Sequence, residues 1–291
     1  LLPAGLAAQT DADVARATER IAPRMIEIRH DIHQHPELSN RETRTAALVA
    51  EELRRLGLEV RTGVGKTGVV GILRGGKPGP VVAIRADMDA LPVTEQGDLP
   101  FKSVMTAQYL GRETGVFHAC GHDTHVAAQL GVANILAGMK ARLTGTVVFI
   151  FQPAEEGPPP GEAGGASLMI AEGALRDPRP DLILAFHANG VPPDAEGEDE
   201  RLGRVAYTPG PTYAAATRWS ARVLGRQAHG VGIEARGAPL GLVVGPEVGR
   251  AGAVVAGAAH AERIIATMAS PFRNLSLRIF GSPPKGCVEL T

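Results

Sequence analysis

The sequence predicts an α/β fold in which a sheet is covered by helices on both faces. Short, near-continuous apolar segments of strand type alternate along the chain with longer segments of helical periodicity. Strands that are apolar along their whole length are typical of a sheet buried on both sides. The 291 residues, of which 44% are hydrophobic and 21% charged, are enough for one sizeable core and a small second domain.

Two helical segments open the chain. The first is expected to be divided at Pro23, because proline lacks the amide hydrogen that a helix interior needs. The second is expected to begin after Asn40, a favourable N-cap, and to end at Gly57. The residues of the two apolar stripes are Val14, Ile21, Met25, Ile28 and Ile32 in the first segment, and Leu48, Val49, Leu53 and Leu56 in the second.

Five strands and two further helices are expected next. Each expected strand is a short apolar run, and no repeat at a fixed period is visible along the chain. The expected strands are 58–60, 68–73, 81–87, 145–152 and 181–187, and the expected helices are 122–139 and 166–172.

Composition divides the chain into four regions. Residues 1–10 look like the end of an apolar segment. We therefore favour the remnant of an export signal, as in a periplasmic or secreted protein, over the alternative of a frayed N-terminus in a cytoplasmic protein. Residues 11–204 are expected to form the main domain, which closes on a polar, Pro- and Gly-rich loop. Residues 205–230 alternate like the first strands of a smaller α/β domain, whereas residues 231–291 follow no sustained helical or strand period.

Charge and hydropathy exclude several classes of partner. A net charge of −1 gives no electrostatic reason to expect nucleic acid or an acidic membrane as a partner. The sequence has no run of eighteen apolar residues, so no segment is expected to span a bilayer. Its two cysteines, Cys120 and Cys287, do not make a disulfide framework.

Charged and imidazole side chains follow three of the expected strands. Asp87 and Asp89 end the third strand, Glu155 and Glu156 follow the fourth, and His187 ends the fifth. In open α/β sheets, ligands bind outside the carboxyl ends of the strands. These side chains are therefore expected to face one crevice.

The stretch FHACGHDTHVAA, residues 117–128, holds one cysteine, three histidines and an aspartate. Taken singly, a buried cysteine is more often a small hydrophobic residue than a ligand. Cys120 and His122 nevertheless lie where a loop enters a helix, so they can face the same crevice as the strand ends. Thiolate and imidazole ligands suit zinc, and carboxylates admit manganese, so the combination predicts a metal site.

Glu155 and Glu156 are adjacent carboxylates at the end of a hydrophobic strand. Burying like charges together is costly, and a bound cation explains the pair. One glutamate is expected to bind the metal, which leaves its neighbour to act as general base on a metal-bound water. An alternative enzyme with Cys120 as nucleophile leaves both glutamates unexplained, and His122 is too close in sequence to serve as its base.

Five motifs occur in an order that resembles a known family, the metal-dependent amidohydrolases. That family includes hippurate hydrolases, N-acyl-amino-acid deacylases and plant auxin-conjugate hydrolases, and belongs with the dinuclear metallopeptidases of the aminoacylase and carboxypeptidase type. The resemblance covers residues 24–229. The motifs are IRHDIHQHPELS, IRADMDALPV, HACGHDTH, FQPAEEG and AFHA.

The resemblance implies hydrolysis of the amide bond of an N-acylated amino acid by a metal-activated water. It also implies a zinc-peptidase-like catalytic domain with a three-layer mixed sheet, a smaller lid domain that often dimerises, and two divalent ions, Mn²⁺ or Zn²⁺. By resemblance, the metal ligands are Cys120, which bridges the two ions, His122, Glu156 and His187, and the general base is Glu155. The resemblance also implies that His229 reaches the substrate carbonyl, and that the acidic residues Asp87 and Asp123 orient the ligands.

The chain departs from the family pattern directly after His229. The fifth ligand of the family, a histidine in a second catalytic segment, has no match, and His260 stands in a different context. Residues 231–291 lack Asp, Tyr and Trp, which fits an out-of-frame reading, a chimeric gene or a divergent tail. The alternative to an active hydrolase is therefore a catalytically impaired, metal-binding remnant.

Overall fold

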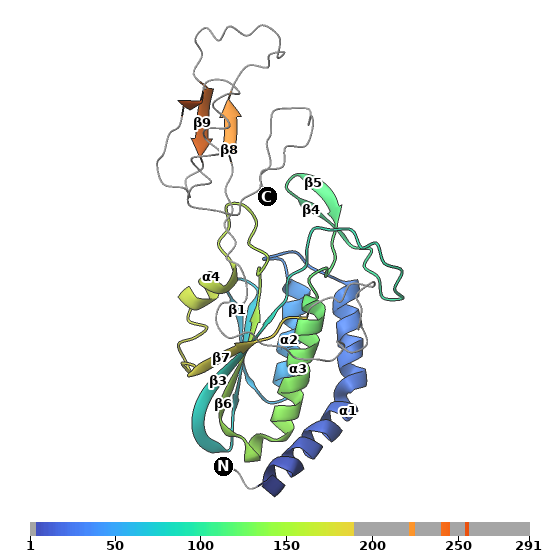
Figure 1. The fold of residues 1–291 in the computed structure, drawn as a ribbon, viewed down its shortest axis with the longest axis vertical. Helices are drawn as coiled ribbons and strands as arrows, with labels where there is room; N and C mark the ends of the chain where they lie inside the picture. Colours follow the sequence, from blue (N-terminus) through green and yellow to red (C-terminus); the bar gives the residue numbers. More distant parts are fainter. Residues whose placement is uncertain (1–3, 189–220, 225–239, 245–253, 256–291) are drawn as a thin grey trace. The chain divides into compact units, whose positions relative to one another are not determined.

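The computed structural model describes residues 4–188 and, beyond them, the strands β8 (Ala221–Leu224), β9 (Leu240–Val244) and β10 (Val254–Val255). The chain divides into two compact units, Leu1–Leu202 and Gly203–Thr291 (Figure 1). Side-chain surroundings are described within residues 11–188. The expectations for His229, His260 and Cys287 lie outside the described residues.

A five-stranded mixed sheet forms the centre of the first unit. β1, β2 and β6 are joined by antiparallel pairing, whereas β3 pairs in parallel with β6 on one side and with β7 on the other. The predicted α/β class is therefore confirmed, and all five expected strands occur. In spatial order the strands are β1 (Glu59–Val64), β2 (Gly68–Arg74), β6 (Thr144–Gln152), β3 (Lys77–Asp87) and β7 (Leu182–Ala185).

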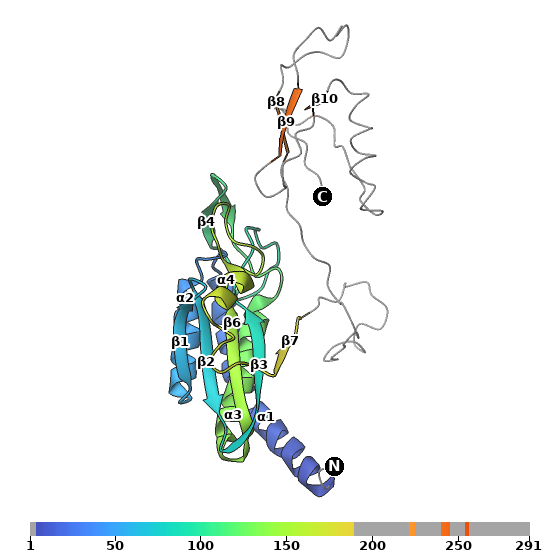
Figure 2. The ribbon, with the colours of Figure 1, turned by 90° about the vertical axis from the view of Figure 1, so that its left-hand side faces the viewer.

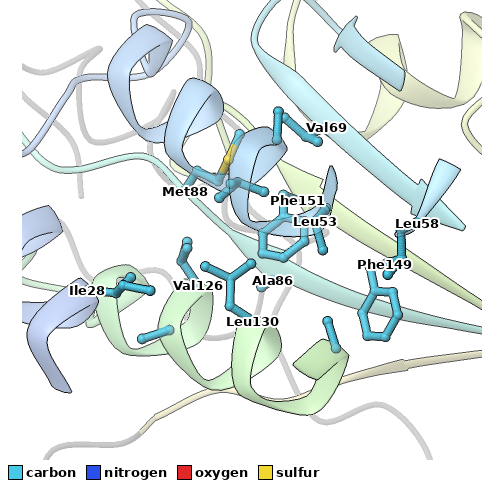
Figure 3. Close-up of a cluster of buried hydrophobic side chains, with 14 of the residues drawn as sticks. Ile28, Leu53, Leu58, Val69, Ala86, Met88, Val126, Leu130, Phe149 and Phe151 are labelled. Carbon is cyan, nitrogen blue, oxygen red and sulfur yellow. The ribbon is translucent and has the colours of Figure 1, made fainter. Parts of the chain in front are cut away.

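Helices cover both faces of this sheet (Figures 1 and 2). Three long helices lie on one face and the short α4 on the other. Along β6, Phe149 and Phe151 join the cluster under the long helices (Figure 3), and Ile150 joins Met169 of α4. Successive side chains of a strand point to opposite faces, so a strand covered on both sides is apolar throughout. The helices are α1 (Ala4–Gln34), α2 (Thr43–Arg55), α3 (His122–Gly138) and α4 (Gly165–Ala171).

The first helix, α1, runs unbroken through Pro23, so the expected division there is wrong. Proline removes one helical hydrogen bond, but residues on both sides of it pack on α3. A Cβ atom added to Gly131 of α3 would lie 3.5 Å from Ile21 Cδ1 and 3.4 Å from Met25 Cγ. Ile28, further along α1, is fully buried in the main core. Packing along the length of the helix outweighs the lost bond.

The second helix, α2, begins three residues after its expected N-cap. Asn40 adopts φ 63°, and its side chain donates hydrogen bonds to the segment 162–163 instead. Glu37 caps the start of the helix: its carboxylate accepts a hydrogen bond from the Thr45 amide at 2.8 Å. The expected end is confirmed, since Gly57 follows the helix with φ 76°.

A β-hairpin that no apolar run predicts lies between β3 and α3. Its strands are β4 (Thr106–Tyr109) and β5 (Arg112–Gly115), paired antiparallel. The two residues that connect them, Leu110 and Gly111, have φ values of 51° and 75°. Positive φ at both positions is typical of a tight two-residue hairpin turn. The strands are largely polar and none of their residues is fully buried, so hydrophobic periodicity does not reveal them.

The described part of the second unit is a three-stranded antiparallel sheet in the order β10-β9-β8. β9 and β10 fall within residues 231–291, where the sequence shows no sustained strand period. These strands have 5 and 2 residues, too few to produce a sustained period in the sequence. Among the described residues, no helix is both long and apolar enough to cross a membrane.

Candidate metal centre

The parallel strands bring most of the predicted site residues to one edge of the first unit's sheet. Because β3 is parallel to both β6 and β7, the carboxyl ends of these strands lie together. The start of α3 reaches the same edge, and among the described residues His122 belongs to each of three groups of converging donors. The groups whose donor atoms lie within 4.8 Å of one another are Cys120, His122 and His187; Asp87, His122 and His125; and His122, Glu155 and Glu156.

His122 is fully buried, and its two ring nitrogens have different surroundings. Nδ1 lies 2.8 Å from the carbonyl oxygen of Asp89. A carbonyl only accepts, so Nδ1 carries hydrogen and the neutral ring keeps its lone pair on Nε2. Nε2 has no hydrogen-bond partner among the described residues. It lies 4.0 Å from Asp87 Oδ2, 3.9 Å from Glu155 Oε2 and 3.9 Å from Glu156 Oε1.

The charges around His122 favour a cation at Nε2. Burial opposes a positive charge on the ring, but the hydrogen bond to Asp89 and the negative charges of Asp87 and Asp89 outweigh it and raise the pKa of His122 to about 8. A proton therefore binds at the position that a metal ion would occupy. This orphaned nitrogen, facing three carboxylates, fits a divalent ion.

Asp87, one of the three carboxylates near this nitrogen, is only 2% exposed. It forms an ion pair with Arg85, and its Oδ2 is 3.7 Å from Nδ1 of His125. The other nitrogen of His125, Nε2, accepts a hydrogen bond from the Ala188 amide at 2.9 Å. In the neutral ring, Nδ1 therefore carries hydrogen and has no lone pair to offer a metal ion, and it makes no hydrogen bond among the described residues.

The two glutamates differ in exposure and in environment. The side chain of Glu155 is 35% exposed and that of Glu156 26%. Burial, followed by the negative charge of Asp87, raises the pKa of Glu155, although Arg85 opposes the shift from 3.6 Å. A carboxylate with a raised pKa that solvent can reach suits general acid–base work.

Cys120 lies beside a histidine, but not the one next to it in sequence. Its Sγ is 3.4 Å from Nε2 of His187. Burial is the largest cause that raises the pKa of the Cys120 thiol to about 12, followed by a hydrogen bond and charge from Glu156 and by the charge of Glu155. Nucleophilic cysteines have lowered pKa values. The surroundings therefore disfavour the cysteine-nucleophile alternative and suit a thiolate bound to a cation.

One predicted residue, Asp123, faces a different cluster although it follows His122 directly. Its Oδ2 lies 2.9 Å from Nδ1 of His33 and 3.1 Å from Nε of Arg29, both on α1. His33 also contacts Glu95 through Nε2, at 3.2 Å. Asp123 therefore ties the start of α3 to α1.

The His33 cluster predicts a pH-dependent contribution to stability. The hydrogen bond to Asp123 raises the pKa of His33, burial opposes it, and Glu95 adds to the rise. A raised folded-state pKa gives stability that is complete below the unfolded value of about 6.5 and is lost as pH rises through the folded value. In urea unfolding, His33→Gln is therefore expected to lower the free energy of unfolding more at pH 5.5 than at pH 9. An equal loss at both pH values would contradict this.

Two residues near the site were given no role from the sequence. Asp89 accepts hydrogen bonds from the Ser39 hydroxyl at 2.7 Å and from the Glu156 amide at 3.0 Å, and its carbonyl holds His122. Its spacing of two from Asp87 was visible at the end of the strand. His125 lies three residues after His122, hence on the same helix face, and that spacing could have indicated it.

The mixed sheet and the thiol, imidazole and carboxylate groups at its carboxyl edge define an α/β protein of the metallopeptidase type. The chain belongs to peptidase family M20/M25/M40, whose model matches residues 83–280. This confirms the family that the motifs indicate. The match continues past His229, beyond the region 24–229 in which the motifs lie.

Relatives of the chain include named hydrolases. It is 45% identical over 207 residues to thermostable carboxypeptidase 1 of Saccharolobus solfataricus, covering 71% of this chain and 47% of the relative. It is 38% identical over 203 residues to hippurate hydrolase of Campylobacter jejuni, covering 70% and 47%. It is 36% identical over 205 residues to N-acetyl-L-cysteine deacetylase of Bacillus subtilis, covering 70% and 44%. The chain thus spans about half the length of these curated relatives.

Two solved structures share the fold. A protein described as an aminohydrolase from methicillin-resistant Staphylococcus aureus is 45% identical with a TM-score of 0.54, over 60% of this chain and 42% of that one. A dinuclear metal-binding peptidase of family M20 from Bacillus subtilis is 40% identical with a TM-score of 0.51, over 59% and 44%. These similarities agree with the catalytic-domain fold that the sequence predicts.

Proposed function

We propose that the protein hydrolyses the amide bond of N-acyl-amino acids or related small amides, with the help of two divalent metal ions, Mn²⁺ or Zn²⁺. The observation that carries this proposal is Nε2 of His122, a buried nitrogen without a hydrogen-bond partner among the described residues that faces three carboxylates. The substrate class is supported by relatives named hippurate hydrolase and N-acetyl-L-cysteine deacetylase.

The proposed ligands are Cys120, His122, Glu156 and His187. When bound, divalent ions polarise a carbonyl group and make a water molecule more acidic. The Nε2 atom of His122 is available to bind such an ion, since Nδ1 is occupied by its hydrogen bond, and carboxylates surround it. Metal ions and protons therefore compete for the same atoms. Asp87, in contact with Arg85 and close to His125, helps to fix the orientation of this group.

Glu155 is the proposed general base. Its carboxylate takes a proton from the attacking water and passes it to the departing amine. Two features support this role: the side chain is 35% exposed, so substrate and water can reach it, and its pKa is raised. A base with a pKa nearer to neutral is more effective at returning the proton to the leaving group.

The remaining parts of the proposal concern His229, the lid domain and Asp123. His229, outside the described residues, is proposed to reach the substrate carbonyl and stabilise the developing oxyanion. Residues 205–230 are proposed to begin a lid domain, through which the protein forms a homodimer. Asp123 is proposed to orient His122 through the backbone of α3, since its side chain contacts α1.

The proposal is tested by metal binding and turnover in the purified chain. With Mn²⁺ or Zn²⁺ added, the protein is expected to bind metal, measured by elemental analysis after dialysis, and to release free amino acid from hippurate or an N-acetyl amino acid. Bound metal without turnover would support the alternative, a catalytically impaired remnant. Absence of both would overturn both readings.

A further inference from the structure

The loop that carries Glu155 and Glu156 is held at two backbone amides, one on each side of Glu155. The Ala154 amide donates to Oε1 of Glu42 at 2.8 Å. The Glu156 amide donates to Oδ2 of Asp89 at 3.0 Å. Ala154 has φ 49°, a region that residues with a Cβ atom adopt rarely. The conformation of this loop is therefore set by its partners and not by the local preference of Ala154.

Glu42 is one of these partners, and it joins three parts of the fold. It precedes α2, it accepts a hydrogen bond from the Thr67 hydroxyl at 2.5 Å in the turn between β1 and β2, and it holds Ala154 after β6. Its side chain is fully buried. A buried carboxylate is costly unless its oxygens are hydrogen-bonded, and both oxygens of Glu42 are.

The start of α2 does not explain why a carboxylate is buried here. Glu42 makes no side-chain capping bond to its own helix. Glu37 caps the helix instead, through the amides of Arg44 and Thr45. The side-chain bonds of Glu42 lead away from the helix, one of them to the residue directly before Glu155.

We propose that Glu42 is a positioning residue for the glutamate loop. By accepting the Ala154 amide hydrogen, it sets the backbone so that the carboxylates of Glu155 and Glu156 face His122. The catalytic meaning of this inference rests on the proposed function, but the anchoring itself can be measured without it. Small errors in the placement of such groups have large effects on catalysis.

The test compares Glu42→Leu with Glu42→Gln. Leucine removes both hydrogen bonds, whereas glutamine offers a carbonyl oxygen to the Ala154 amide and an N–H to the Thr67 hydroxyl, which can also accept. Glu42→Leu is expected to weaken Mn²⁺ or Zn²⁺ binding by about 10–100-fold in calorimetric titration, and Glu42→Gln to restore most of it. Amide hydrogen exchange at Ala154 is expected to accelerate in Glu42→Leu but not in Glu42→Gln, with or without metal.

A matched control separates positioning from general destabilisation. Glu37→Ala removes the cap at the start of the same helix, and the hydrogen bonds of the Glu37 side chain go to Thr43, Arg44 and Thr45 and not to the glutamate loop. It is expected to lower stability while leaving metal affinity and exchange at Ala154 unchanged. Should Glu42→Leu not fold, Thr67→Val removes one of the two bonds of Glu42 and is expected to shift both readouts in the same direction, by less.

Three results would overturn the inference. The first is unchanged amide hydrogen exchange at Ala154 in Glu42→Leu. The second is a loss of metal affinity in Glu37→Ala as large as that in Glu42→Leu, and the third is a metal affinity in Glu42→Gln no higher than in Glu42→Leu. If the wild-type chain binds no metal, the proposed function fails, and exchange at Ala154 still decides whether Glu42 anchors the loop.

Discussion

Glu155→Gln is expected to lower kcat of the metal-loaded protein by about 10²–10⁴-fold, the range typical of a lost general acid–base group. Glutamine keeps the size and polarity of the side chain but cannot accept and return a proton. The affinity for metal is expected to stay at the wild-type value, because Glu156 and not Glu155 is the proposed ligand. Turnover of an N-acyl-amino acid and metal content after dialysis measure the two effects separately.

The neighbouring residue provides the control. Glu156→Gln removes a proposed ligand and is expected to lower metal affinity, which Glu155→Gln leaves unchanged. Both side chains lie 3.9 Å from Nε2 of His122, so distance alone does not distinguish their roles. If Glu155→Gln kept most of its activity, or if both variants lost metal alike, the division of roles between the two glutamates would be wrong.

His122→Asn is expected to cause the largest loss of metal binding of any single substitution in the cluster. His122 is the residue shared by all three groups of converging donors, and its Nε2 is the buried nitrogen that faces the carboxylates. The loss of metal affinity is expected to exceed roughly 10–100-fold, which is the loss that typically follows removal of a residue that hydrogen-bonds to a metal ligand. Titration calorimetry with Zn²⁺ or Mn²⁺ measures it.

A second histidine on the same unit serves as the control. His30 lies on α1 and stacks on Phe101, with ring centroids 3.7 Å apart. His30→Gln is expected to keep the metal affinity of the wild-type protein. Wild-type affinity in His122→Asn would mean that the cation binds elsewhere, and the proposed centre would have to be abandoned.

The sheet could be predicted from the sequence because its signal is local. The apolar runs at 68–73, 81–87 and 145–152 became β2, β3 and β6, the three central strands in sequence order. Their parallel or antiparallel pairing was not visible, but the rule for strand ends still placed Asp87, Glu155 and His187 together. The family followed from the motifs, and the match to residues 83–280 confirms it.

Helix starts and a hairpin were harder to predict, because partners distant in sequence decide them. Pro23 stays inside α1 because that helix packs on α3. Asn40 is drawn away from α2 by the segment 162–163, and Glu37 takes its place as the cap. The β4–β5 hairpin is largely polar and at most partly buried, so it carries no hydrophobic period.

The sequence by itself determined the α/β class, the family and the residue types that gather at one edge of the sheet, because a local pattern or motif indicates each of them. Only the tertiary structure decided which atoms meet: Nε2 of His122 with the carboxylates, Cys120 with His187, Asp123 with His33, and Glu42 with the Ala154 amide. Periodicity reports which face of an element is buried. The partner of a buried polar atom is set by where other elements cross it, and that depends on the packing of the whole unit.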